Sequence, residues 1–126
     1  MGDLTKNFSR SEFACKCGCG KNNLDRRVVE ACQTIRDAMG QPISVNSGVR
    51  CEKNNAAAGG AANSYHIQGL AADLSCKSGA LGLYLCILNL CDKGKLPDVH
   101  YVIWYQKKNF VHIDLGKIRN NRFAVK

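Results

Sequence analysis

The sequence is poor in the residues that most often act as catalytic acids and bases. Glutamate occurs only at Glu12, Glu30 and Glu52, and the chain has 3 histidines. A site that needs either residue type therefore has few candidates. No run of about 18 apolar residues is present, which excludes a membrane-spanning helix. The first residues lack the apolar segment of a secretory signal, so we expect cytoplasmic synthesis without a signal peptide.

The length and composition indicate one globular domain. A chain of 126 residues with 45% hydrophobic residues is long enough to bury a core and is too apolar to be a disordered basic tail. We therefore expect a single domain over residues 1–126, with a cysteine-rich N-terminal segment, residues 1–23, packed on it. Helical and antiparallel-strand patterns are mixed without a βαβ rhythm. This mixture predicts an α+β fold with a small antiparallel sheet and flanking helices.

The net charge of +8 favours a polyanionic partner, either nucleic acid or an anionic cell wall. The basic residues are dispersed, with short clusters at 26–27, 107–108 and 117–122. None of the common nucleic-acid-binding motifs is present. The pattern is more typical of a solvated basic surface than of a binding stripe, so we expect no nucleic-acid partner.

Local patterns predict most of the elements. Residues 25–39 carry one apolar stripe that includes Cys32 and Ile35, and Gly40 follows, so a helix is expected there. Ser9 and Glu12 have the spacing of a capping box around a short helical turn. A second helix, capped by Ser78 and running to about Asp92, is apolar nearly all round and should lie inside the domain. Short strands are expected at 43–49 and 70–75, and residues 52–65 form an ordered loop or a short helix.

The last third of the chain predicts a β-hairpin. Its strands are residues 100–105 and 110–115, with a turn at 106–109. Alternation places Val111, Ile113 and Leu115 on the core side, and His112 and Asp114 on the opposite face, toward a cleft or solvent. With a four-residue turn, residues 101, 103 and 105 share the face of His112, and His100 points the other way.

Three residues have the chemistry of a metal site. His66 and Asp73 are separated by a segment in which Gly69 allows a turn, and His112 comes from the hairpin. Two imidazoles and one carboxylate suit Zn²⁺ and leave a fourth position for water, as in catalytic zinc sites. From spacing alone, a His–Asp pair is more often a structural hydrogen-bonded pair than a ligand set.

Five segments occur in an order that resembles the zinc D-Ala-D-Ala carboxypeptidase family of peptidoglycan peptidases. The resemblance covers about residues 7–116, and the opening, from Phe8 to Gly20, looks like that of small phage-type members. The segments are Ser47-Gly48-Val49-Arg50, residues 55–60, Asn63-Ser64-Tyr65-His66, Gly69 to Asp73, and Phe110 to Asp114.

This resemblance implies a fold and a function. The fold would be the one shared with the Hedgehog signalling domain. His66, Asp73 and His112 match the zinc ligands, and Arg50 matches an arginine that binds the scissile carbonyl or the substrate carboxylate. Ser47 and Ser64 match positions near the substrate. The implied enzyme is a zinc peptidase that cuts the peptidoglycan stem peptide or cross-bridge, as a phage or prophage lysin acting on the cell wall. We expect a monomer without a membrane partner.

The general base is the weakest part of the match. Family members carry a glutamate or histidine a few residues before the last ligand, whereas residues 106–110 here contain no suitable base. Asp114, His100 and Asp98 remain as candidates, and we favour Asp114 in a role that supports His112. The usual tyrosine at position 49 is Val49. The missing base also allows an alternative function, a non-catalytic zinc-binding module that attaches to the wall or the virion.

Seven of the 8 cysteines fall into two groups. Cys32, Cys86 and Cys91 lie in predicted helices and are expected to be core residues. The loop that contains Cys15, Cys17 and Cys19 lacks C-x₂-C spacing, which disfavours a second zinc site. In sequences that resemble this one, a cysteine at position 51 recurs with this loop. We therefore hypothesise a clip between the loop and Cys51, which would hold the arginine loop.

Overall fold

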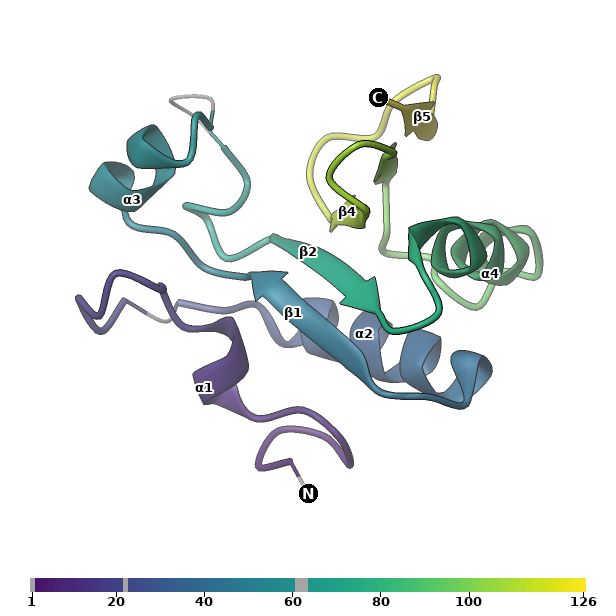
Figure 1. Ribbon diagram of the computed structural model, residues 1–126, viewed down its shortest axis with the longest axis horizontal. Helices are drawn as coiled ribbons and strands as arrows, with labels where there is room; N and C mark the ends of the chain where they lie inside the picture. The colour runs from purple at the N-terminus through teal and green to yellow at the C-terminus, as the bar shows by residue number, and fades with distance from the viewer. Residues whose placement is uncertain (1, 22, 61–63) are drawn as a thin grey trace.

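The computed structural model describes residues 2–21, 23–60 and 64–126. It contains four helices and five strands in this part of the chain, and Figure 1 shows their arrangement. The helices are α1 Arg10–Phe13, α2 Arg26–Met39, α3 Glu52–Ala57 and α4 Ala80–Asp92. The strands are β1 Ile43–Ser47, β2 Ala71–Cys76, β3 Tyr101–Tyr105, β4 Phe110–Asp114 and β5 Phe123–Val125.

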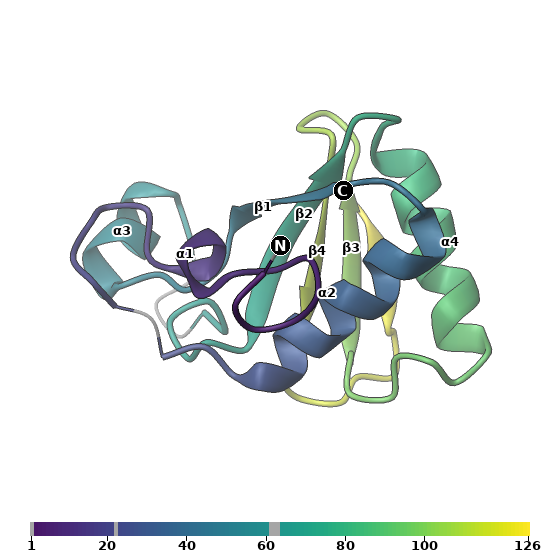
Figure 2. The same ribbon diagram turned by 90° about the horizontal axis from the view of Figure 1, so that it is seen from below.

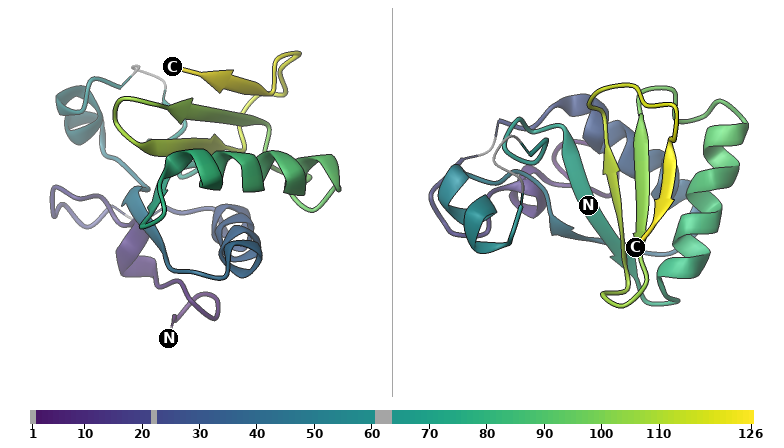
Figure 3. Two further views of the ribbon diagram at one scale, coloured as in Figure 1. Left: turned by 45° about the vertical axis from the view of Figure 1, so that its right-hand side comes forward. Right: turned by 90° about the horizontal axis from the view of Figure 1, so that it is seen from above.

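The strands form one sheet in the order β1-β2-β4-β3-β5. All neighbouring pairs are antiparallel except β3 and β5, which are parallel. Helices α2 and α4 cover one face of the sheet, and α1 and α3 lie beside the β1 edge (Figures 2 and 3). This is the predicted α+β class, with a mostly antiparallel sheet and flanking helices.

The core lies between the sheet and the two long helices. Alternate residues of the central strands face it, among them Leu74 of β2 and Ile113 of β4. From the helices, Ile35 and Ile87 are fully buried against them. Phe8 and Phe13 of the N-terminal segment belong to the same core. Because the core includes these rings, the segment is packed into the domain.

The local predictions agree with the structure to within one or two residues at most element ends. The capping box at α1 is present, since Glu12 accepts a hydrogen bond from the backbone N–H of Ser9 at 2.7 Å. Residues 52–57 form α3, and part of the predicted loop at 52–65 lies outside the described residues. Strand β5 was not predicted, because its three residues carry no distinctive pattern.

Two expectations about α4 were wrong. Ser78 does not cap it: Gly79 is the N-cap residue, and the first helical N–H, of Ala80, donates to Oδ1 of Asn109 at 2.9 Å. The cap comes from the hairpin turn, which a local pattern does not reveal. The helix is also not inside the domain on all sides, because Leu81 and Leu85 are each about half exposed.

No helix in the described part of the chain combines the length and the apolar character needed to cross a membrane.

Candidate functional site

Sheet register brings Asp73 and His112 together. They are direct partners on the adjacent strands β2 and β4. Their neighbours in sequence, Ala72 and Val111, face the helices and are fully buried. Because side chains alternate along a strand, Asp73 and His112 project from the opposite face, which is the face predicted for His112.

His66 reaches the same place from the loop before β2. Gly69 has φ +74, a left-handed conformation that favours glycine and turns the chain into the strand. Nδ1 of His66 lies 2.7 Å from the carbonyl oxygen of Gly48, and the His66 carbonyl accepts a hydrogen bond from the N–H of Arg50 at 3.0 Å. These two contacts hold the ring of His66 beside β2, and the residue is 3% exposed.

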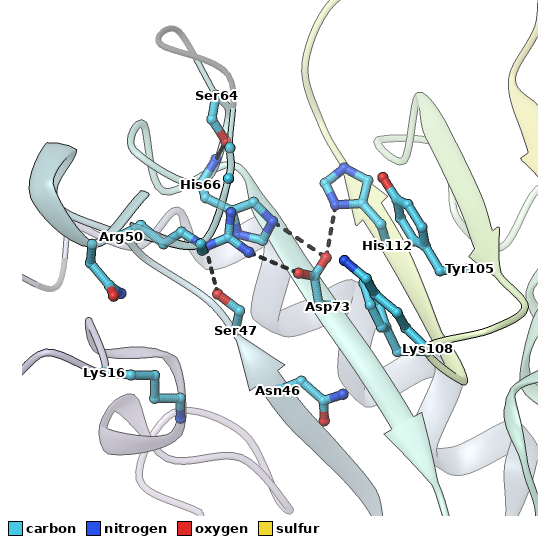
Figure 4. Close-up of a pocket in the computed structure, with 15 residues that line it drawn as sticks. Lys16, Asn46, Ser47, Arg50, Ser64, His66, Asp73, Tyr105, Lys108 and His112 are labelled. Carbon is cyan, nitrogen blue, oxygen red and sulfur yellow. Dashed lines mark hydrogen bonds and ion pairs between the residues drawn. The ribbon is translucent and has the colours of Figure 1, made fainter. Parts of the chain in front are cut away.

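One carboxylate oxygen is the meeting point of the two histidines. Oδ1 of Asp73 lies 3.3 Å from Nε2 of His66 and 2.9 Å from Nδ1 of His112 (Figure 4). The three donor atoms lie within 4.8 Å of one another. The structure therefore brings the three predicted metal ligands into one cluster.

The outer contacts of the two rings decide which nitrogen faces the cluster. A carbonyl oxygen can only accept, so Nδ1 of His66 carries a proton and donates it to Gly48, which leaves the Nε2 lone pair for the cluster. Nε2 of His112 lies 2.8 Å from Oδ2 of Asp114. The Asp114 carboxylate accepts a proton from Nε2, which leaves the lone pair of the neutral ring on Nδ1. Nδ1 is the atom that faces Asp73.

Close packing shifts the pKa values of His112 and Asp73. Burial alone would lower the pKa of His112, but hydrogen bonds to Asp114 and Asp73 raise it to about 9. Burial alone would raise the pKa of Asp73, but the hydrogen bond with His112 holds it well below its usual range. Without a metal, His112 therefore carries a positive charge between the two carboxylates, and Arg50 is a second cation beside Asp73.

The donor set and its spacing fit a zinc-type ion. Zinc lies about 2.0–2.1 Å from imidazole and carboxylate ligands, so the edges of its tetrahedron measure about 3.3 Å. The separations of Oδ1 of Asp73 from the two ring nitrogens, 2.9 and 3.3 Å, are close to this value. Two neutral imidazoles and a carboxylate are ligands that zinc and similar divalent ions accept.

Arg50 completes the inner wall of the site. Its Nη2 lies 3.1 Å from Oδ2 of Asp73, and Nε donates to Oγ of Ser47 at 2.9 Å. Nη1 donates to Oδ1 of Asn55, which is 2% exposed, at 3.3 Å. The guanidinium is thus fixed at three points beside the metal-ligand cluster. Of these partners, Asn55 was not predicted, although it lies in a segment that carries the resemblance.

The remaining predicted residues separate into two groups. Ser64 lies at the site, where its Oγ accepts from the N–H of His66 at 3.2 Å, and Asp114 lies behind His112. His100 and Asp98 lie apart: Nδ1 of His100 is 2.6 Å from the Gly116 carbonyl, and Asp98 lines a different pocket. Asn63 of the motif is outside the described residues.

A pocket of about 640 Å³ opens over the cluster. Sequence reasoning identified Ser47, Arg50 and Ser64 on its wall but missed Tyr105, Lys108 and Lys16. Figure 4 shows Tyr105 and Lys108 beside His112, and Lys16 on the far side of the pocket. Hairpin alternation places Tyr105 on the face of His112, and that signal could have identified it.

Comparison with known proteins identifies the family of the chain. No curated protein sequence matches the chain. A sequence model of the peptidase M15 family matches residues 6–114, which include every residue of the cluster and Arg50. The chain belongs to the peptidase M15 family.

Proposed function

We propose that the protein is a zinc-dependent peptidase that hydrolyses a peptide bond in the stem or cross-bridge of peptidoglycan. Either D-Ala-D-Ala carboxypeptidase or L-Ala-D-Glu endopeptidase activity is consistent with this chemistry. The observation that carries the proposal is the convergence of His66, Asp73 and His112 beside Arg50 at a pocket, with both rings oriented by outer acceptors.

The chain's own residues would hold the ion and orient the substrate. Zinc in this position would make water nucleophilic near neutral pH and would polarise the scissile carbonyl. Arg50 would donate to the carbonyl oxygen as it gains negative charge, or to the substrate carboxylate, since its planar group suits either. Ser47 would keep the guanidinium in place through its contact with Nε.

The charges of the pocket favour an acidic peptide. Lys16, Arg50 and Lys108 line it, and Asp73 is its one carboxylate among the described lining residues. Peptidoglycan stems carry free carboxylates, which these cations would attract. The net charge of +8 would also favour approach to an anionic wall, and this attraction should weaken with salt. A phage-type lysin would use both effects.

The position of Asp114 favours a second candidate function. Asp114 accepts hydrogen bonds from Nε2 of His112 and from the N–H of Gly116 at 3.1 Å. Both of its carboxylate oxygens therefore support neighbouring groups and are not directed at a substrate. Among the described residues, no other carboxylate besides Asp73 lines the pocket. A zinc-binding wall module without turnover would also have this arrangement.

Incubation of the purified protein with peptidoglycan separates the two functions. A peptidase should release new free amines, and a chelator should stop the release. His66→Ala should abolish the release and the zinc binding at the site of His66, Asp73 and His112, whereas His100→Gln, at a histidine outside the cluster, should change neither. Zinc bound at this site, with wall binding but no released amines, would support the non-catalytic module. A protein without bound zinc, in which His66→Ala has no effect, would contradict both functions.

The position of the new amine identifies the bond that is cut. Mass spectrometry of the released fragments distinguishes loss of a terminal D-alanine from cleavage between L-alanine and D-glutamate. The lysin role requires that added protein lowers the turbidity of cells with exposed peptidoglycan, and that His66→Ala does not.

A further inference from the structure

Four thiols converge at a second place in the molecule. The Sγ atoms of Cys15, Cys17, Cys19 and Cys51 lie within 4.8 Å of one another. Cys17 Sγ is 3.4 Å from that of Cys15 and 3.6 Å from that of Cys51. A disulfide bond measures about 2.05 Å, and all eight cysteines are free thiols. The predicted proximity of the loop to Cys51 is present, but no covalent bond joins them.

The spacing of the four sulfurs suits a metal better than a disulfide. Zinc lies about 2.3 Å from thiolate sulfur, so the edges of a tetrahedral four-sulfur site measure about 3.8 Å. The two sulfur separations given above lie just below this value. Closure around an ion would therefore need shifts of only a few tenths of an ångström at these two pairs.

Glycine conformation explains how closely spaced cysteines can face one point. Gly18 and Gly20 have φ +82 and +85, a region that other residues rarely adopt. The N–H of Gly18 donates to the carbonyl of Cys15 at 3.3 Å, which tightens the turn. C-x₂-C spacing does not predict this cluster, because the loop turns at each glycine and the fourth sulfur comes from Cys51.

Several N–H groups are directed at the sulfurs. The backbone N–H of Cys51 donates to Cys15 Sγ at 3.3 Å, and that of Asn54 donates to Cys51 Sγ at 3.4 Å. The side-chain amide of Asn54 lies 3.5 Å from Cys15 Sγ. Such donors stabilise the thiolate, which is the form that binds metals.

We propose that Cys15, Cys17, Cys19 and Cys51 bind a structural zinc ion. Soft thiolate ligands favour zinc among the common divalent ions, and four protein ligands leave no position for substrate. Binding would displace the thiol protons into solution, so the ion should bind more weakly as the pH falls. The proposal does not depend on the peptidase activity.

The four-sulfur cluster lies where the N-terminal segment meets the loop that carries Arg50, so an ion there would stabilise this contact. The N–H of Val49 donates to the carbonyl of Phe13 at 2.7 Å, and the N–H of Cys51 donates to Cys15 Sγ. Arg50 therefore stands between two contacts with the N-terminal segment. An ion at the four sulfurs would fasten this segment to the loop that carries Arg50.

Metal analysis of the full chain, purified under reducing conditions, tests the proposal. Cys17 and Cys19 are exposed, so Cys17→Ser/Cys19→Ser should leave the core intact. This variant should lose one zinc equivalent relative to the wild-type protein, and His66→Ala should lose a different one. The variant that combines all three changes should lose both. Cys76→Ser, outside the cluster, is the matched control and should lose none.

Cobalt replacement identifies the ligands without reference to activity. Cobalt bound to thiolates gives an intense charge-transfer absorption in the near ultraviolet. We expect this absorption in the wild-type protein and in His66→Ala, and we expect its loss in Cys17→Ser/Cys19→Ser. If that variant fails to fold, the wild-type and His66→Ala spectra still decide the question. Absence of the absorption, or a mass that rises on reduction because a disulfide opens, would overturn the proposal.

Discussion

Oδ2 of Asp114 lies 2.8 Å from Nε2 of His112, on the side of the ring away from Asp73. The contact fixes which nitrogen of His112 can serve a metal, although Asp114 itself lies outside the cluster of ligands. A carboxylate in this position makes the imidazole a stronger ligand and limits its rotation.

Asp114→Asn should weaken metal binding by about 10- to 100-fold. The amide can donate to Nε2, which would move the ring proton to Nδ1 and remove the ligand lone pair. Competition with a chromogenic chelator measures the affinity. Asp98→Asn changes an aspartate in a different pocket and should have no effect. An unchanged affinity in Asp114→Asn would show that this carboxylate does not orient the ligand.

Arg50→Lys should lower kcat/KM by about 10²- to 10³-fold if Arg50 stabilises the developing oxyanion. Lysine keeps the charge but cannot contact Asp73, Ser47 and Asn55 together. Zinc content should stay constant, because Arg50 is not a ligand. Arg26→Lys, at a side chain that is 63% exposed, is the control. Loss of zinc in Arg50→Lys would instead assign it a role in holding Asp73.

Lys108→Gln should raise KM for an acidic stem peptide by about two- to fivefold, with kcat unchanged, as for a single exposed charge. Lys108 lines the pocket, whereas its exposed neighbour Lys107 does not. Lys107→Gln is therefore a control of equal net charge. The difference between the two variants should shrink at high salt. Equal effects of both substitutions would indicate that only net charge matters.

The metal-free protein should be most stable at moderately acid pH. The pKa of His112 is raised from 6.5 to about 9, so its stabilising effect is complete below pH 6.5 and is lost as the pH rises through 9. The pKa of Asp73 is lowered from 3.8, so its contribution is present above pH 3.8 and is lost as the pH falls. Urea unfolding across pH 3–10 should show both losses. His112→Gln should remove the alkaline loss, and its persistence there would contradict this assignment.

Gly48→Ala should destabilise the protein by about 1–3 kcal/mol. A β-carbon at Gly48 would lie 2.6 Å from the Phe13 carbonyl oxygen and 2.7 Å from its Cα, and backbone cannot easily retreat. Gly82→Ala is a matched control within α4, where a β-carbon meets no atom within 4 Å. That change should stabilise the protein by about 0.5–1 kcal/mol. Denaturant midpoints measure both, and equal values would contradict the close approach.

Much of the fold follows from local patterns, because most elements here depend on nearby residues. The stripe on α2, the capping box at Ser9 and the alternation of β4 each fix an element and its buried face. The cap of α4 was predicted wrongly because Asn109 supplies it from 29 residues away. Strand β5 was missed because its pairing with β3, and not its composition, makes it a strand.

The candidate site also has a part that the sequence predicts and a part that it does not. Alternation and the family resemblance identify His66, Asp73, His112 and Arg50, since these residues lie in motifs. The acceptor for His66 could not be predicted, because it is a backbone carbonyl, of Gly48, in a distant loop. The spacing of the cysteines in the loop disfavoured a second metal site. The convergence of four sulfurs depends on the backbone conformation of Gly18 and Gly20, which the sequence does not reveal.

The direct pairing of Asp73 with His112 has a consequence for folding. These residues are 39 positions apart, and β4 must dock on β2 before their donor atoms can meet. Closing so long a loop costs chain entropy, so a partly folded chain would offer a metal only scattered ligands. An ion that binds the assembled site opposes separation of the two strands. Zinc affinity measured along a denaturant titration would then report the docking of these central strands.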